Sequence, residues 1–197
     1  MIVSDRARCI FVHIQKTAGA SIEAALQAHD PAAGSGLHAG RRHMLAREIR
    51  DVVPRDAWDA YFKFAFVRNP WDRLVSWYHM CMQVTEDNAF SRFVKQHAPT
   101  FEAFLTTAAA GPGARTTRDQ VDYVSDEQGT VIVDFVGRYE SVATDFAHVC
   151  RQLGVAAPLP HVNTSAHRDY REYYTAATRE IVARRFARDI ERFGYRF

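Results

Sequence analysis

Residues 9–21 run from a continuous apolar stretch through a short turn into a helical pattern, which restricts how the chain folds. The turn consists of small and polar residues and carries Lys16. A strand that enters a helix through such a turn directs backbone N–H groups and the positive end of the helix dipole at one point, beside the lysine charge. The segment therefore predicts an anion site after this strand.

A second strand and helix follow at residues 61–82. Residues 61–67 are almost continuously apolar, which is typical of a parallel strand covered on both faces, and the run ends at Arg68. Asn69 and Pro70 supply a helix cap and a first-turn proline. Ser76 lies off the apolar stripe of this helix, so Arg68 and Ser76 are predicted to hold a second anionic group. The stripe consists of Trp71, Leu74, Val75, Tyr78 and Met82.

The rest of the chain alternates between strand and helix patterns. Strands are predicted at residues 121–124 and 130–136, and helices at 89–97, 101–109, 142–153 and 176–193. Residues 31–36 and 111–113 are expected to be loops and not domain boundaries. At 197 residues and 47% hydrophobic, the chain is expected to form a single α/β domain over residues 1–197. A mostly parallel central sheet is expected to carry helices on both faces.

Charge and cysteine content limit the classes of partner and compartment. The net charge is only +2, from 25 Lys and Arg against 23 Asp and Glu, so no general attraction to nucleic acid or membranes is expected. Cys9, Cys81 and Cys150 lie far apart in apolar stretches and form no CxxC pair, which predicts reduced thiols, a cytoplasmic protein and no zinc site. No export signal or membrane span is expected, because no apolar run approaches about 18 residues.

Both anion-binding segments resemble a known family. Residues 15–21 resemble the 5′-phosphosulfate loop of the sulfotransferases that use 3′-phosphoadenosine 5′-phosphosulfate (PAPS). Residues 64–78 resemble their 3′-phosphate motif, in which an Arg and a Ser stand eight positions apart. The resemblance continues through residues 134–140, 159–165 and 189–195, and is strongest to the branch of the carbohydrate sulfotransferases and small bacterial relatives. It implies a P-loop-like, three-layer fold.

The resemblance also implies a co-substrate and its contacts. PAPS is the expected sulfuryl donor, with no metal. Lys16 would neutralise charge on the leaving 5′-phosphate, while Arg68 and Ser76 would hold the 3′-phosphate. Ala20 stands where the family commonly has a hydroxyl residue. The other expected donor contacts are Thr17, Ala18, Gly19, Ala20 and Ser21 in the first loop, and Thr164, Ser165, His167 and Arg168 in a late loop.

Sulfuryl transfer to a hydroxyl needs a base. The family places a catalytic His or Glu between the loop and the second strand, and His43 is the preferred candidate there, with His38 second. His13 is expected to be packed in the core. The acceptor is expected to be a carbohydrate or another small hydroxylated molecule. Its cleft is expected to border on Tyr78, His79, Arg115 and Arg118.

Two other functions stay open from the sequence. One is a P-loop phosphotransferase, although the loop lacks the Gly-x-x-x-x-Gly-Lys-Ser/Thr pattern and Arg68 follows the second strand where a magnesium-binding Asp is expected. Asp134 is the nearest substitute and is expected in mid-strand. The other is a non-catalytic nucleotide or nucleic-acid binding module. The sequence makes no prediction of oligomeric state.

Overall fold

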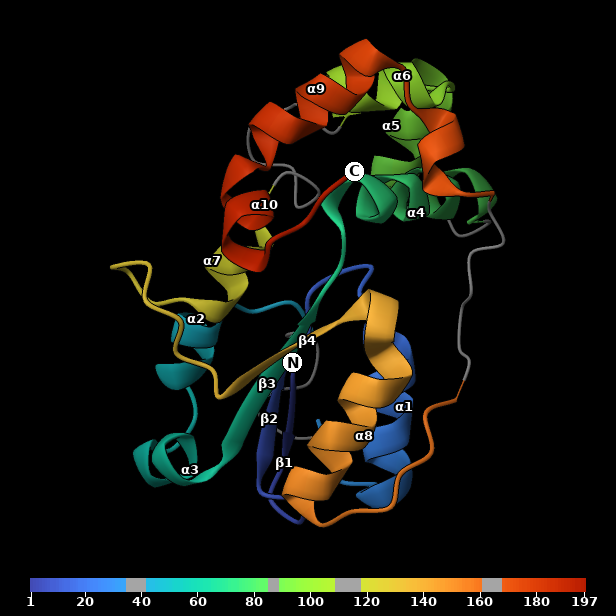
Figure 1. Ribbon diagram of the computed structural model, residues 1–197. Helices are drawn as coiled ribbons and strands as arrows, with labels where there is room; N and C mark the ends of the chain where they lie inside the picture. Colours follow the sequence, from blue (N-terminus) through green and yellow to red (C-terminus); the bar gives the residue numbers. More distant parts are fainter. Residues whose placement is uncertain (35–41, 85–88, 109–117, 161–167) are drawn as a thin grey trace. The chain divides into compact units, whose positions relative to one another are not determined.

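The computed structural model describes residues 1–34, 42–84, 89–108, 118–160 and 168–197 (Figure 1). These residues form two compact units. The first, here called the sheet unit, comprises Met1–Arg68 and Gln120–Thr164. The second, the helical unit, comprises Asn69–Asp119 and Ser165–Phe197. The first of the boundaries between them falls directly after Arg68.

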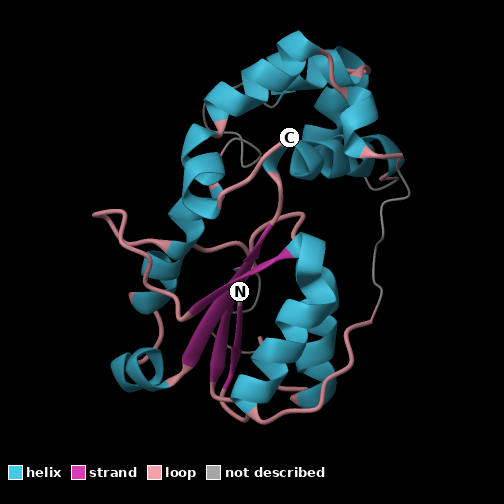
Figure 2. Cartoon of the chain, viewed as in Figure 1, coloured by secondary structure: helices cyan, strands magenta, loops and turns pink. Residues whose placement is uncertain are grey.

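A four-stranded sheet forms the centre of the sheet unit (Figure 2). Its strands lie in the order β1 (Ile2–Ser4), β2 (Cys9–Val12), β3 (Phe62–Val67) and β4 (Phe135–Arg138). β1 is antiparallel to β2, whereas β2, β3 and β4 are mutually parallel. The expected α/β fold with a mostly parallel sheet is confirmed. Because β2 and β3 are parallel, the segments that follow them leave from the same edge of the sheet.

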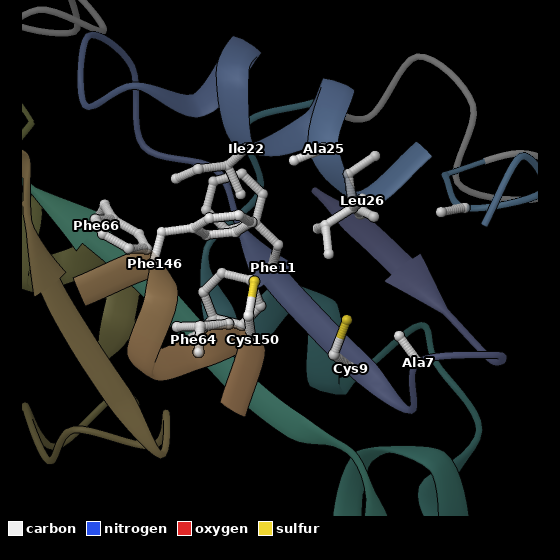
Figure 3. Packing of buried hydrophobic residues seen from close by; sticks show 13 residues of the cluster. Ala7, Cys9, Phe11, Ile22, Ala25, Leu26, Phe64, Phe66, Phe146 and Cys150 are labelled. Carbon is white, nitrogen blue, oxygen red and sulfur yellow. The ribbon is translucent and has the colours of Figure 1, made fainter. Parts of the chain in front are cut away.

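Helices cover both faces of this sheet (Figure 1). One face carries α1 (Gly19–His29) and α8 (Val142–Leu153), while α2 (Ala46–Arg50), α3 (Arg55–Ala60) and α7 (Gln120–Val124) lie on the other side. Figure 3 shows the core under α1 and α8, where Phe11 and Phe64 of the sheet pack with side chains of both helices. All of β2 is buried, as a strand covered on both faces must be. The helix-side contributions to this core are Ile22, Ala25, Leu26, Phe146, Val149 and Cys150.

The helical unit begins at the predicted cap. The Asn69 side chain accepts a hydrogen bond from the Trp71 N–H at 3.0 Å, and Pro70 opens α4 (Pro70–Gln83), which confirms this part of the prediction. The unit also contains α5 (Ala89–His97), α6 (Phe101–Ala103), the π-helix η2 (Phe104–Ala108), the 3-10 helix η5 (Tyr170–Tyr173), α9 (Ala176–Arg185) and α10 (Ala187–Phe193). Its core contains Trp71, Leu74, Val75, Trp77, Phe101, Phe104, Val182 and Phe186. None of the helices in the described part of the chain is both long and apolar enough to span a bilayer.

Several predicted elements differ from the structure. Residues 121–124 belong to α7 and not to a strand. The strand expected at 130–136 begins only at Phe135, so Asp134 precedes β4 and does not lie within it. The helix expected over 176–193 is interrupted at Phe186, whose φ of −111° and ψ of 29° are not helical. β1 was not predicted, because three residues are too few to carry an alternating pattern.

Candidate active site

The loop between β2 and α1 has an unusual backbone. Lys16 has a φ of 68° and Ala18 a φ of 67°, whereas Thr17 between them does not have a positive φ. Left-handed conformations cost non-glycine residues about 1–2 kcal/mol each and persist where the surroundings impose them. Alternation of the two hands turns successive N–H groups toward one side and forms a concavity that binds anions. The positive φ angles of Lys16 and Ala18 are compatible with such a concavity, and the anion site itself stays a prediction.

The start of α1 adds to this concavity. Ala18 is the cap residue and makes no side-chain hydrogen bond to the helix, while its carbonyl accepts from the N–H groups of Ser21 and Ile22 at 3.0 and 3.1 Å. Thr17 is fully buried, and its Oγ1 donates to the Ile14 carbonyl at 2.9 Å. This bond engages the single hydroxyl proton of Thr17 and shapes the turn. Contact of Thr17 or Ser21 with a donor molecule stays a prediction.

Arg68 reaches from the end of β3 to this loop. The side chain is 3% exposed, and its Nη1 donates to the Lys16 carbonyl at 3.2 Å. Its guanidinium carbon lies 3.8 Å from the ring centroid of Tyr139, which opens the 3-10 helix η4 (Tyr139–Ser141) after β4. Stacking on an aromatic face holds a guanidinium while leaving its in-plane donors available to acceptors. The Arg68 guanidinium thus contacts the backbone of the loop that carries Lys16, within the sheet unit.

His43 lies beside the same loop. Its Nδ1 is 3.0 Å from the carbonyl oxygen of His13, and its ring is 4.6 Å from the His13 ring. Because a carbonyl only accepts, Nδ1 carries the proton of the neutral ring and Nε2 carries the lone pair. Burial lowers the pKa of His43 to about 4, against the raising effect of the bond to His13, and the charges of Arg42 and the chain's amino terminus lower it further. The ring is therefore a neutral proton acceptor at neutral pH.

A half-buried carboxylate, that of Glu23, bonds to two residues near His43. Oε1 of Glu23 lies 2.8 Å from His13 Nδ1, and Oε2 accepts from Arg42 Nε at 2.9 Å. Burial raises the pKa of Glu23, but the hydrogen bonds from His13 and Arg42 outweigh it and bring the pKa down to about 2. Burial also lowers the pKa of His13. The His13 ring packs so closely on Gly19 that a Cβ at that position would lie 1.8 Å from Nε2.

The low pKa of Glu23 predicts a pH dependence of stability. Its value of about 2 in the folded chain lies below the ordinary 4.5, so the unfolded chain binds more protons between these values and stability falls as pH drops from 4.5 toward 2. A Glu23→Gln variant should be less stable than wild type by up to about 3 kcal/mol above pH 4.5. The difference should shrink toward pH 2. Urea unfolding at a series of pH values measures it, and a difference that stays constant with pH contradicts the assignment.

The remaining predicted residues belong to the helical unit or lie outside the described residues. Ser76 lies in α4 of the helical unit and is 2% exposed. Arg168 is exposed and pairs with Glu172 at 3.3 Å in the same unit. Tyr78 donates to the Pro99 carbonyl at 2.6 Å, and His79 Nε2 lies 2.8 Å from the Tyr173 hydroxyl. His38, Arg115, Thr164, Ser165 and His167 lie outside the described residues. In the described part of the chain, no three His, Cys, Asp or Glu side chains are placed to hold a metal ion.

Several residues of the site were not predicted, Glu23, Gln120 and Tyr123 among them. Glu23 stands four positions after Gly19, so the two residues share one face of α1. Because this face meets His13, the spacing was a local signal that Glu23 contacts His13. Gln120 and Tyr123 bond to Arg68 and Gln15, which are distant in sequence, and no local pattern signals such pairs. His13 is buried as expected, and it also bonds to Glu23 and His43.

Comparison with known proteins identifies the family of the chain. The model of the Sulfotransferase family matches residues 1–196, and the chain belongs to that family. An uncharacterized protein of Archaeoglobus fulgidus is 32% identical over 130 residues, which cover 66% of this chain and 98% of that protein. The crystal structure of mouse sulfotransferase SULT7A1 complexed with PAP superposes with a TM-score of 0.57 at 14% identity, covering 95% of this chain and 86% of the mouse chain. That likeness concerns the fold alone.

Proposed function

We propose that this protein transfers a sulfuryl group from PAPS to a hydroxyl of a carbohydrate or another small hydroxylated metabolite. The observation that carries the proposal is the bond from Arg68 to the Lys16 carbonyl, which joins the two predicted anion-binding segments at one edge of the sheet. Membership of the sulfotransferase family supports sulfuryl transfer. The PAP bound in the mouse relative supports PAPS as the donor, since PAP is the adenosine 3′,5′-bisphosphate that remains after transfer.

In the proposed reaction, the acceptor oxygen forms a bond to sulfur as the bond from sulfur to the 5′-phosphate oxygen breaks. The acceptor proton passes to Nε2 of His43, whose Nδ1 bond to His13 fixes the required tautomer. Lys16 and the N–H groups of residues 18–20 stabilise the charge that develops on the leaving phosphate. Arg68 holds the 3′-phosphate, and the sequence motif adds Ser76 as a second contact. No metal is included, because a monoanionic sulfuryl group needs less charge compensation than a phosphoryl group.

The phosphotransferase alternative gains no support from Asp134. Its carboxylate accepts from the Lys63 N–H at 2.7 Å and lies 3.1 Å from Lys63 Nζ, before β4 begins. It therefore lies near the amino end of that strand. The anion loop and Arg68 follow the carboxyl ends of strands parallel to it. A magnesium ion bridging phosphates at the loop would need a carboxylate at that other edge.

Ligand binding followed by transfer tests the proposal. Adenosine 3′,5′-bisphosphate should raise the unfolding temperature more than ATP with magnesium does at equal concentration. Transfer of ³⁵S from labelled PAPS to a panel of carbohydrate, phenol, lipid and peptide hydroxyls should then identify the acceptor. A preference for ATP with magnesium supports the phosphotransferase alternative. Bisphosphate binding with no transfer to any acceptor supports a non-catalytic binding module.

Arg68 is expected to determine the preference for a 3′-phosphate. An Arg68→Lys variant keeps the charge but loses the fork of donors, and should bind adenosine 3′,5′-bisphosphate about tenfold more weakly, because hydrogen bonds to charged groups contribute about 1.5–3 kcal/mol. Its affinity for 5′-AMP should change much less. Isothermal titration calorimetry measures both constants. Arg55→Lys, at an arginine whose side chain is 85% exposed and pairs with Asp59, is the matched control. Equal losses for both nucleotides contradict the assignment.

A further inference from the structure

The short helix α7 places two buried polar side chains on one side. Gln120 is fully buried and Tyr123 is 2% exposed. They stand at positions i and i+3, which share a face of a helix. Neither residue belongs to the segments that the sequence motifs assign to the nucleotide. Their hydrogen bonds nevertheless reach both segments.

The Gln120 side chain forms two hydrogen bonds with the backbone of Arg68. Its Oε1 accepts from the Arg68 N–H at 2.9 Å, and its Nε2 donates to the Arg68 carbonyl at 2.8 Å. The paired registers end earlier, at Ala65 against β2 and at Val67 against β4. At Arg68, the first residue beyond the sheet, the side-chain amide of Gln120 thus supplies the two backbone hydrogen bonds that a neighbouring strand would otherwise make. It fixes the direction in which the Arg68 side chain leaves the backbone.

Tyr123 holds the other segment. Its hydroxyl donates to Oε1 of Gln15 at 2.9 Å, and both side chains are buried. Gln15 immediately precedes Lys16, the first of the two left-handed residues of the loop. A hydrogen bond in a buried position restrains its partner more than one in water, because the partner has no water to exchange with. Tyr123 therefore restrains the entry into the anion loop.

We propose that α7 is a brace for the donor nucleotide, in which Gln120 positions Arg68 for the 3′-phosphate and Tyr123 positions the Lys16 loop for the 5′-phosphate. The proposal rests on the proposed function and extends it to two residues that touch neither phosphate. One rigid helix holding both segments keeps the spacing of the two phosphate-binding groups constant. Preorganised spacing favours a ligand that spans both groups over one that occupies a single group.

Two conservative variants separate the two halves of the brace. Gln120→Met keeps the length of the side chain and removes both bonds to Arg68. It should weaken binding of adenosine 3′,5′-bisphosphate and of 3′-AMP about tenfold and leave 5′-AMP within about twofold. Tyr123→Phe removes one hydroxyl and should weaken the bisphosphate and 5′-AMP about fivefold while sparing 3′-AMP. Isothermal titration calorimetry of the full chain with the three nucleotides gives these ratios.

Controls distinguish positioning from a general loss of stability. Gln152→Met on the exposed side of α8 and Tyr61→Phe, which removes a bond to Asp5 at an exposed site, should leave all three affinities unchanged. If Gln120 acts through Arg68, the double variant Gln120→Met/Arg68→Lys should bind the bisphosphate no more weakly than Arg68→Lys alone. Additive losses contradict the proposal.

The outcomes also separate this proposal from the function on which it rests. If the wild-type chain does not prefer the bisphosphate over 5′-AMP, the proposed donor is wrong. If it does, but each brace variant weakens the three nucleotides equally, the brace is wrong while the donor stands. Should Gln120→Met not fold, Tyr123→Phe carries the test, because it removes a single oxygen atom, and equal loss of 5′-AMP and 3′-AMP then overturns the proposal.

Discussion

Replacing His43 with alanine is expected to reduce kcat at least about 100-fold, because it removes the proton acceptor for the substrate hydroxyl. The bond between Nδ1 and the His13 carbonyl leaves Nε2 with the lone pair, and burial holds the pKa of His43 at about 4. The ring is therefore neutral throughout the neutral range, with its lone pair on Nε2. Affinity for adenosine 3′,5′-bisphosphate should be unchanged, since His43 is assigned to the acceptor. Single-turnover transfer of ³⁵S measures the chemical step directly.

The pH profile gives an independent readout of the same role. For the free enzyme, the acid limb of kcat/KM should fall near pH 4 and not near 6.5, the ordinary pKa of an imidazole. The limb should disappear in the residual activity of His43→Ala. His29→Ala, at the carboxyl end of α1, is the matched control and should retain full turnover. Full turnover of His43→Ala, or an acid limb near pH 6.5 that survives the substitution, removes the role.

Secondary structure is predicted best from the sequence where a continuous apolar run marks a buried strand or a capping residue marks the start of a helix. The apolar run at 61–67 and the Asn69 cap predicted β3 and α4, and the structure confirms both. The pattern fails at residues 121–124, where Val, Tyr and Val favour a strand by residue type although the segment is a helix. In a strand, Gln120 and Tyr123 would point to opposite faces, whereas in the helix both turn toward the anion-binding segments. Tertiary bonds thus override local preference at α7.

Some residues of the candidate site could be predicted from the sequence and others could not. Arg68 directly follows β3 and Lys16 lies in the loop after β2, so the order of elements along the chain is enough to predict that their segments meet at one sheet edge. The residues that hydrogen-bond to these segments cannot be predicted from the order of the elements. Gln120 is 52 positions from Arg68, and Tyr123 is 108 positions from Gln15. Glu23 is the exception, because its spacing of four from Gly19 places both residues on one face of α1, and this spacing can be recognised in the sequence.

Replacing Gly19 with alanine is expected to destabilise the sheet unit by about 3 kcal/mol and to slow sulfuryl transfer about 100-fold. The new Cβ would lie 1.8 Å from Nε2 and 2.1 Å from Cδ2 of His13, far inside any contact distance. The ring cannot yield easily, because it is bonded to Glu23 and packed against Phe11 and His43. Alanine favours a helix by about 1 kcal/mol over glycine, so a net loss would show that the clash prevails.

A double-mutant cycle identifies the cause of that loss. Gly19 does not have a positive φ, so the structure requires glycine there for space and not for backbone freedom. Removing the ring should therefore make room for the methyl group. The variant His13→Ala/Gly19→Ala should be more stable than the sum of the two single losses predicts, by at least about 1 kcal/mol, because residues in contact couple. Urea unfolding gives the four free energies. Strict additivity would show that the close approach of the His13 ring to the anion loop does not determine the choice of glycine.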